Sequence, residues 1–225
     1  TFPHAGDYWK ARHYTKIWSP YNSNELYAVH TGTGRGTYSI SGSTVTLLNS
    51  TTTLPENTEI RISGYKDATN FYLYTLSNYN TLYKTANSGA TWNTVGGTLP
   101  VNAWNVGIHA SPFDSNKLFF GAVNCYRSYN QGLNWTEVNG WAQYYGNTNY
   151  LHADMMDIRS FEKTNGTKFI LVGNHGGLHV SYDYLATTSN IGQIGLNISQ
   201  YYDVRTDPTN PNYIYAGAQD QGHQR

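Results

Sequence analysis

The sequence predicts an all-β protein that is built from repeated four-stranded units. Short apolar runs alternate with polar residues, helical periodicity is nowhere sustained, and Gly or Pro interrupts nearly every ten residues. One turn-like motif also occurs twice, as TANSGATW at 85–92 and as SYNQGLNW at 128–135. A spacing of about forty residues is typical of a supersecondary unit that is copied along a chain.

Each position of the repeated motif has a mechanical reason. The Asn side chain can hydrogen-bond the backbone of its own turn, Gly can adopt a positive φ, and Trp can pack the next strand on the core. We therefore predict a turn between the third and fourth strands of two successive units. Its structural residues are Thr85, Asn87, Gly89 and Trp92 in one copy and Ser128, Asn130, Gly132 and Trp135 in the other.

The same order of elements recurs elsewhere in the chain. An apolar run, a turn with Ser-Pro or Asp-Pro and a second apolar run follow Ile17, Val106 and Tyr202, and a related pattern follows Met156. Such units are typical of the blades of a β-propeller, in which each sheet packs on its neighbours. We expect an incomplete propeller of about four and a half blades, with units at 12–55, 56–100, 101–140, 150–192 and, in part, 198–225.

The composition argues against several classes of function. Only 12% of the residues are charged, the formal net charge is zero and no Lys/Arg run is present, so no nucleic-acid partner is expected. No window of about 18 apolar residues predicts a membrane span. The Gly-rich segment TGTGRG precedes a strand rather than a helix, so it does not predict a phosphate site, and no cofactor is expected. The composition favours an extracellular or cell-surface location.

The repeated motif resembles the Asp-box of BNR-repeat propellers. Asn87 and Asn130 stand where that family usually has Asp. Asp183, in the segment SYDYLATT, keeps the Asp but lacks the Gly and the Trp. The resemblance implies that the motif is structural and lies far from any active site.

A second resemblance covers roughly the last 75 residues. The segments LHADMMDI at 151–158, LVGNHGGLHVSYD at 171–183 and the run at 195–222 are similar to large secreted BNR propellers. Such proteins are common in Bacteroidota, and the segments also resemble sortilin-like and xyloglucanase-like propellers. The family patterns H-x-D-x-H, G-N-D-G-G and A-G-x-Q-D-N-G are each changed once here, at Met156, His175 and Gln221.

Propeller topology predicts one face on which polar residues gather. The loop that enters the first strand of each blade and the turn between its second and third strands open on this face, together with Asn105, Asn124 and the 31–35 loop. The predicted ligand-binding residues are His152, Asp154, Asn174, His175, Gln219 and Asp220, with Trp141 and Tyr144 in the aromatic segment 141–150 that rims the face.

This set of residues has two interpretations. A shallow polar site with aromatic walls would suit sugar rings, which stack on aromatic side chains and hydrogen-bond through their hydroxyl groups. Alternatively, Asp154, Asn174 and Asp220 only cap strand ends and turns, as Asp and Asn do for local reasons. A metal site is a further hypothesis, because His152, Asp154 and His175 are residue types that bind Zn²⁺. His179 is expected to point away from the turn.

Catalysis requires more than polar residues on one face. Glycoside hydrolysis generally uses two carboxylates, for which Asp154 and Asp220 are the candidates, while Asp157 is expected on a first strand. The Arg triad of the sialidase branch of BNR proteins is absent from the sequence, so that activity is not supported.

The sequence therefore favours an extracellular propeller module that binds or scaffolds, with a carbohydrate or a surface protein as its ligand. Its blades would be completed by further residues of the same chain or by a partner chain. The alternative is a glycoside hydrolase of xyloglucanase-like type, and a third possibility is a purely structural repeat.

Overall fold

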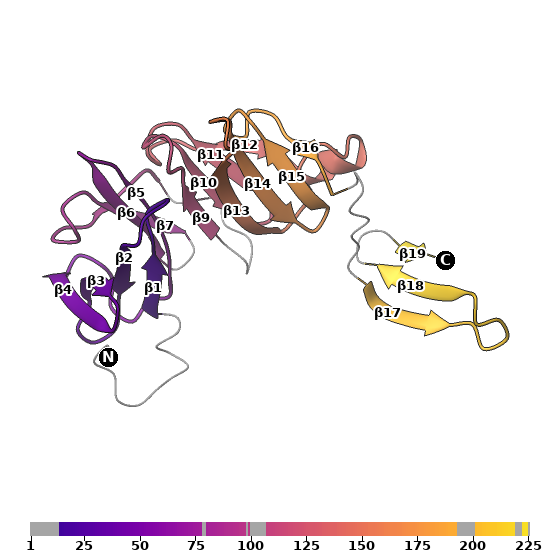
Figure 1. Cartoon of the computed structure of the whole chain (residues 1–225), viewed down its shortest axis with the longest axis horizontal. Helices are drawn as coiled ribbons and strands as arrows, with labels where there is room; N and C mark the ends of the chain where they lie inside the picture. The colour runs from indigo at the N-terminus through magenta and orange to yellow at the C-terminus, as the bar shows by residue number, and fades with distance from the viewer. Residues whose placement is uncertain are drawn as a thin grey trace.

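The structure is a computed structural model that describes residues 14–77, 80–97, 99, 107–192, 201–218 and 222–224. Its strands form five antiparallel sheets that follow one another along the chain, four with four strands and one with three (Figure 1). Within each sheet the strands are paired in sequence order. The predicted fold class, an all-β incomplete propeller with four-stranded blades, is confirmed.

The first four sheets, which we call blades 1 to 4, share one order of strands. Blade 1 contains β1 (Thr15–Trp18), β2 (Leu26–His30), β3 (Gly36–Ser41) and β4 (Thr44–Ser50). Blade 2 contains β5 (Ile60–Lys66), β6 (Phe71–Ser77), β7 (Thr81–Thr85) and β8 (Asn93–Thr94). Blade 3 contains β9 (Gly107–Ala110), β10 (Leu118–Gly121), β11 (Cys125–Ser128) and β12 (Thr136–Asn139).

A short 3-10 helix, η1 (Trp141–Tyr145), follows blade 3. Blade 4 contains β13 (Met155–Glu162), β14 (Lys168–Asn174), β15 (Gly177–Ser181) and β16 (Ser189–Asn190). The fifth sheet contains β17 (Tyr201–Thr206), β18 (Ile214–Ala218) and β19 (Gly222–Gln224). No helix of the described residues is long and apolar enough to cross a membrane.

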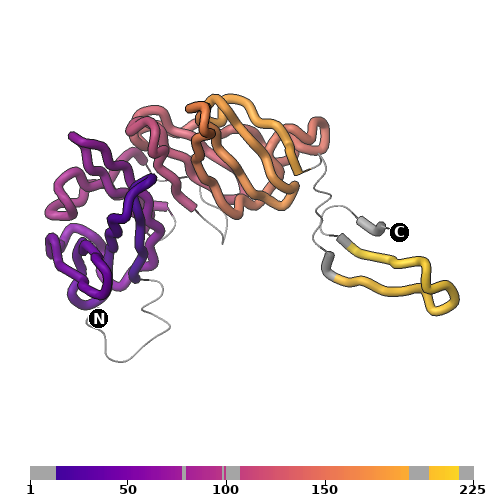
Figure 2. Tube along the Cα trace, in the orientation of Figure 1, coloured from indigo at the N-terminus to yellow at the C-terminus, as the bar shows by residue number. Residues whose placement is uncertain are grey.

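The four blades stand side by side in an arc, with the first strand of each blade along the inner side (Figures 1 and 2). Strands β1, β5, β9 and β13 contact one another in this order. The sheets do not close into a ring, and the fifth sheet lies apart from the arc in Figure 1.

The core lies between the blades because both faces of each inner sheet are apolar. In β6, Leu73 packs into a cluster shared with blade 1, while Tyr74 and Leu76 pack into a cluster shared with blade 3. In β10, Leu118 faces blade 2 and its neighbour Phe119 faces blade 4. Successive side chains of a strand point to opposite faces, so each blade is buried by the blades on either side of it.

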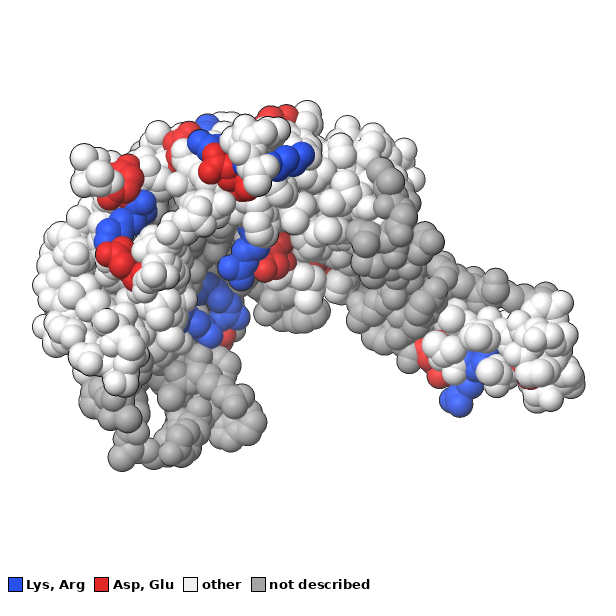
Figure 3. Space-filling model, viewed as in Figure 1, with Lys and Arg blue, Asp and Glu red and all other residues white. Residues whose placement is uncertain are grey.

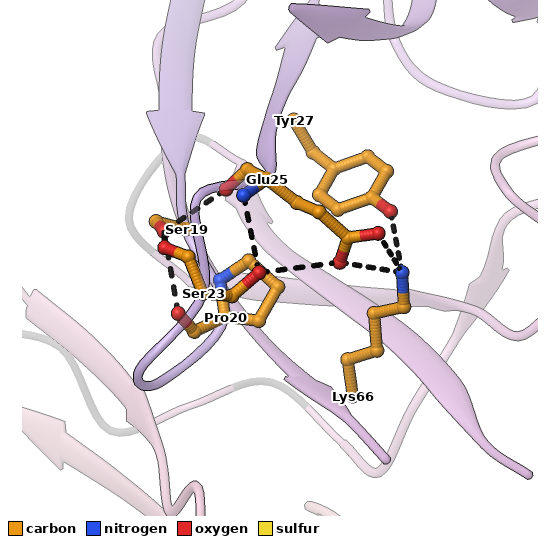
Figure 4. Close-up of polar contacts among 6 residues, drawn as sticks. All are labelled: Ser19, Pro20, Ser23, Glu25, Tyr27 and Lys66. Atoms are coloured by element: carbon orange, nitrogen blue, oxygen red, sulfur yellow. Dashed lines mark hydrogen bonds and ion pairs between the residues drawn. The ribbon is translucent and has the colours of Figure 1, made fainter. Parts of the chain in front are cut away.

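Polar contacts add to the interface of blades 1 and 2 at the surface. The Lys66 ammonium donates to both carboxylate oxygens of Glu25, each at 2.6 Å, and to the Tyr27 hydroxyl at 2.8 Å (Figure 4). It also lies over the ring of Phe71, 5.9 Å from the centroid. An exposed ion pair of this kind contributes at most about 1 kcal/mol, so the aromatic packing carries more of the stability.

The repeated turn joins the third and fourth strands of blades 2, 3 and 4, at 85–92, 128–135 and 181–188. In the first copy the Thr85 hydroxyl donates to Asn87 Oδ1 at 2.8 Å and accepts the Gly89 N–H at 3.0 Å. Asn87 Oδ1 also accepts the Thr91 N–H at 3.0 Å. The second copy repeats these three bonds with Ser128, Asn130, Gly132 and Asn134.

The third copy keeps this hydrogen-bond pattern although it has lost the Gly and the Trp. The Ser181 hydroxyl donates to Asp183 Oδ1 at 2.9 Å and accepts the Leu185 N–H at 2.8 Å, and Thr187 N–H donates to Asp183. Leu185 has a φ of 63°, where the other copies have Gly89 and Gly132. Its side chain is fully buried in the cluster between blades 3 and 4, which offsets the strain of the left-handed backbone.

Each repeated turn also packs against the preceding blade. Gly132 has a φ of 89°, and a Cβ atom there would lie 2.7 Å from the Leu82 side chain of blade 2 and 3.3 Å from Leu118. The backbone N–H of Trp92, at the end of the first copy, donates to the Thr53 hydroxyl, 3.0 Å away. The turns therefore connect neighbouring blades as well as neighbouring strands.

The substitution Gly132→Ala should lower the free energy of unfolding by about 2–4 kcal/mol, because it combines a left-handed alanine with overpacking. Gly166→Ala is a matched control: its φ is 82°, but nothing lies within 4 Å of the added Cβ. That variant should lose only about 1 kcal/mol. Urea unfolding of both variants measures the difference, and equal losses would contradict the close approach of the turn to blade 2.

The acid stability of the fold should depend on Asp183. Burial alone would raise the pKa of this carboxyl, but hydrogen bonds from Thr187, Ser181 and the Ala186 N–H lower it below its usual value. A folded-state pKa below the unfolded one stabilises the fold above the unfolded pKa, and this contribution is lost as the pH falls below about 4.

Asp183→Asn should therefore fold normally at pH 7 and lose less stability between pH 5 and pH 3 than the unmodified chain. Asn is the natural residue at this position in the other two copies, where Asn87 Nδ2 donates to the Thr91 hydroxyl at 2.9 Å. Chemical unfolding over this pH range tests the prediction. An unchanged acid sensitivity in the variant would show that Asp183 does not contribute.

Candidate functional site

Two of the residues predicted for the ligand site, Asp154 and His175, meet where the segment before β13 passes between two turns. The Asp154 N–H donates to the Val123 carbonyl in the β10–β11 turn of blade 3, at 3.0 Å. The His175 N–H, in the β14–β15 turn of blade 4, donates to the Ala153 carbonyl at 3.2 Å. The segment that enters β13, the β10–β11 turn and the β14–β15 turn therefore lie on one face of the blades, which we call the loop face.

Asp154 and His175 form a side-chain pair on the loop face. His175 Nδ1 lies 3.2 Å from Asp154 Oδ2, and both side chains are largely covered. Asp154 has a φ of 62°, a left-handed conformation that Asp tolerates better than most residues. The pair can hydrogen-bond a polar ligand through the carboxylate oxygens and the imidazole.

Asn174 and His179 form a second polar group behind this pair. Asn174 Nδ2 donates to His179 Nδ1 at 3.2 Å, and Asn174 Oδ1 accepts the Gly176 N–H at 2.8 Å. His179 Nε2 donates to the Thr148 carbonyl at 3.2 Å. The prediction that His179 points away from the turn is wrong, because the ring is buried against the Asn174 side chain. Burial lowers the pKa of His179.

His152 is buried beneath two tyrosines. Its ring meets Tyr144 edge-on at 4.8 Å, and its Nε2 is hydrogen-bonded to the Tyr145 hydroxyl at 3.2 Å. A side chain in this position supports the rings above it, whereas the sequence placed it in the ligand site itself. No group of three His, Cys, Asp or Glu side chains in the described ranges could hold a metal ion.

Three aromatic side chains of the segment 141–150 are exposed, and we name this set the aromatic platform: Trp141 (42% exposed), Tyr145 (59%) and Tyr150 (42%). The rings of Trp141 and Tyr145 meet edge-on with centroids 6.1 Å apart. Tyr144, between them in sequence, is half-buried and donates to the Gly176 carbonyl at 3.4 Å. The platform is thereby connected to the turn that carries His175.

Hydrogen bonds fix the start of the platform segment. The Trp141 N–H donates to Asn124 Oδ1 at 3.1 Å, and the Gly140 N–H donates to Gln143 Oε1 at 3.0 Å. The Asn139 amide bridges the segment, since it donates to the Leu151 carbonyl at 2.9 Å and accepts the Leu151 N–H at 3.1 Å.

Contacts with blade 4 hold the far end of the same segment. The Asn190 N–H donates to Asn149 Oδ1 at 3.2 Å, and the Thr188 hydroxyl donates to the Asn149 carbonyl at 2.6 Å. Together with the His179 bond to Thr148, these contacts give the segment a defined conformation despite its exposure.

Part of the predicted site lies outside the described residues. This applies to Gln219 and Asp220, to Asn105, and to Gln221. The carboxylate pair of Asp154 and Asp220 is therefore still a prediction. Asp157 is on β13, the first strand of blade 4, as expected, and accepts both the Ile158 N–H and the Arg159 guanidinium.

A second candidate region is the channel on the inner side of the arc. It holds a cavity of about 460 Å³ lined by the first strands of all four blades and by the turns that follow β1 and β9. Tyr21 and Phe113 in these two turns meet edge-on with centroids 4.9 Å apart. The two turns have similar sequences, SPYNSN and SPFDSN, and this similarity is the sequence feature that could have indicated the contact.

His109 is a half-buried titratable group beside this channel. Its Nε2 is hydrogen-bonded to the Ser160 hydroxyl of blade 4 at 2.8 Å, and its ring stacks on Phe119. Burial, and to a smaller extent the positive charge of Arg159, lowers the pKa of His109 to about 4, although Asp157 opposes the shift.

Charged residues are few on the surface as well as in the sequence. On the side seen in Figure 3, Lys and Arg lie next to Asp and Glu in small mixed groups. Neighbouring residues form ion pairs in this way, such as Arg61 with Glu59 and Arg159 with Asp157.

Comparison with known proteins gives a likeness in fold. No family model and no curated protein matches the sequence. The GH74 xyloglucanase from Xanthomonas campestris matches with a TM-score of 0.50 and 15% identity, over 91% of this chain and 33% of that chain. The chain has the β-propeller fold.

Two other solved structures match at slightly lower scores. YCF48 bound to D1 peptide gives a TM-score of 0.49 with 8% identity, over 93% of this chain and 67% of that chain. An oligogalacturonate lyase in complex with manganese gives 0.46 with 11% identity, over 90% of this chain and 61% of that chain. This chain spans a third of the length of the xyloglucanase.

The stability of the propeller should fall as the pH is lowered from about 6.5 towards 4, because His109 is neutral in the fold and protonates more readily in the unfolded chain. One such group gives a slope of up to about 1.4 kcal/mol per pH unit. His109→Gln should reduce this slope, as measured by urea unfolding at several pH values. The same slope in the variant would contradict the neutral state of His109.

Proposed function

We propose that this chain is part of an extracellular β-propeller that binds carbohydrate on the aromatic platform. The observation that carries the proposal is the platform itself, in which Trp141, Tyr145 and Tyr150 are exposed on a segment held at both ends by hydrogen bonds. Exposed apolar residues that are grouped on one surface, rather than scattered singly, are typical of binding sites. Rings held in advance lose little entropy when a ligand stacks on them.

The chemistry beside the platform suits sugar hydroxyl groups. His175, the partner of Asp154, lies on the turn to which Tyr144 donates, so aromatic and polar groups are neighbours there. A sugar presents an apolar face of C–H groups and a rim of hydroxyl groups that both donate and accept. The aromatic rings would stack on the apolar face of the sugar. The Asp154 carboxylate and the His175 imidazole would hydrogen-bond its hydroxyl groups.

We further propose that the repeated turn is an Asp-box and that the chain is related to secreted BNR propellers of the Bacteroidota type, including sortilin-like and xyloglucanase-like ones. The three copies share one hydrogen-bond pattern, and the third keeps it with Asp183 in place of Asn. A weakly charged, Asn- and Thr-rich composition supports the extracellular location.

Loss of the platform rings should abolish binding while leaving the fold intact. The probe is a panel of soluble polysaccharides that includes xyloglucan, tested by affinity gel electrophoresis. Trp141→Ala and Tyr145→Ala should each weaken binding by about fivefold, since stacking on one ring contributes on the order of 1 kcal/mol. Tyr182→Ala is the control, because this side chain is 56% exposed at the repeated turn of blade 4, away from the platform.

Two outcomes would overturn the proposal. One is that no polysaccharide of the panel is retarded by the unmodified chain. The other is that Tyr182→Ala weakens binding as much as Trp141→Ala does. Asp154→Asn separates binding from the alternative of a glycoside hydrolase: a binding module should keep the polysaccharide intact with either residue, whereas a hydrolase should cleave it and lose that activity in the variant.

A further inference from the structure

The fifth sheet repeats the local geometry of blade 4. The β13–β14 pairing has a bulge between Met155 and Asp157, and the β17–β18 pairing has one between Tyr201 and Asp203. After each bulge the Asp side chain accepts the next N–H at 2.9 Å and then the guanidinium of the following Arg. Bulges of this kind are specific features, so the two sheets can be matched residue by residue.

The match identifies which face of the fifth sheet should be buried. In blade 4, Ile158, Ile170 and Val172 are buried against blade 3, and Ser160 bonds to His109. The paired registers make Val204, Ile214 and Ala216 the counterparts of the three apolar residues, and Thr206 the counterpart of Ser160. In the fifth sheet Val204 and Ile214 are 52% and 53% exposed, so this apolar face has no cover.

Blade 4 has a second face, which points away from blade 3 and which we call its far face. This face is uncovered in the same way. On blade 3, Gly121 faces blade 4, and a Cβ atom there would lie 2.6 Å from the Met155 side chain. Its counterpart Gly173 on blade 4 has nothing within 4 Å of the same position. The counterpart of His109 on this face is Arg159, whose side chain is 67% exposed.

We infer that the β17–β19 sheet docks on the far face of blade 4 as blade 4 docks on blade 3, and so forms the fifth blade. Val204 and Ile214 would pack on Leu171 and Leu178, the half-buried residues of that face, and Thr206 would lie beside Arg159. The ten residues from 191 to 200 connect the two sheets, and a chain of that length can span up to about 33 Å. The inference does not depend on the proposed carbohydrate ligand.

Thiol cross-linking tests this docking in the full chain. The variant Arg159→Cys with Thr206→Cys places two thiols at the expected contact, both at exposed positions that tolerate substitution. Arg159→Cys with Arg205→Cys is the matched control, because Arg205 precedes Thr206 and points to the opposite face of β17. The natural Cys125 is buried, and burial raises its pKa to about 12, so it stays unreactive.

A short bismaleimide should cross-link the 159/206 pair within one chain at least tenfold faster than the 159/205 pair, as measured by intact mass and peptide mapping. Adding Val204→Asp to the first pair should slow the reaction towards the control rate. Equal rates for the two pairs would overturn the inference. Selective cross-linking that appears only in dimers would also overturn it, because the occupant of the face would then be the fifth sheet of a second copy.

Discussion

A blade with two apolar faces cannot be stable alone, and this requirement for cover on both sides determines how the sheets are arranged. Leu73 and Tyr74 are adjacent in β6 and point into different interblade clusters, and Leu118 and Phe119 do the same in β10. Each sheet therefore needs a neighbour on both sides, which explains why the chain repeats one unit instead of building a single core. It also explains why the outermost sheets present apolar residues to solvent.

The repeated turn is the local device that makes this stacking regular. Its Ser or Thr hydroxyl and its Asn or Asp oxygen fix the backbone, and this backbone then lies against the preceding blade. The residue types of the first two copies made this turn predictable, because Asn and Gly have known local roles. The third copy was recognisable only by Asp183, and its left-handed residue could not be predicted, since the burial of Leu185 replaces the conformational freedom of glycine.

On the loop face, the sequence predicted which residues lie together but not which of them are buried. Topology placed Asp154 and His175 on one face, and the structure brings them within hydrogen-bonding distance. It could not show that His152 is buried under Tyr144 and Tyr145, because burial at a loop depends on contacts between side chains. The residues that line the channel were not predicted for a related reason: its walls come from four strands that are distant in sequence.

Amide hydrogen exchange, followed by mass spectrometry on the full chain, tests the central constraint most directly. If both faces of every blade are covered, the amides of β18 should exchange as slowly as those of β14, because both are second strands flanked by neighbours in their own sheets. Exchange in β18 at the rate of an unfolded chain, with β6, β10 and β14 protected, would contradict the account. It would mean that the fifth sheet is not held by blade 4.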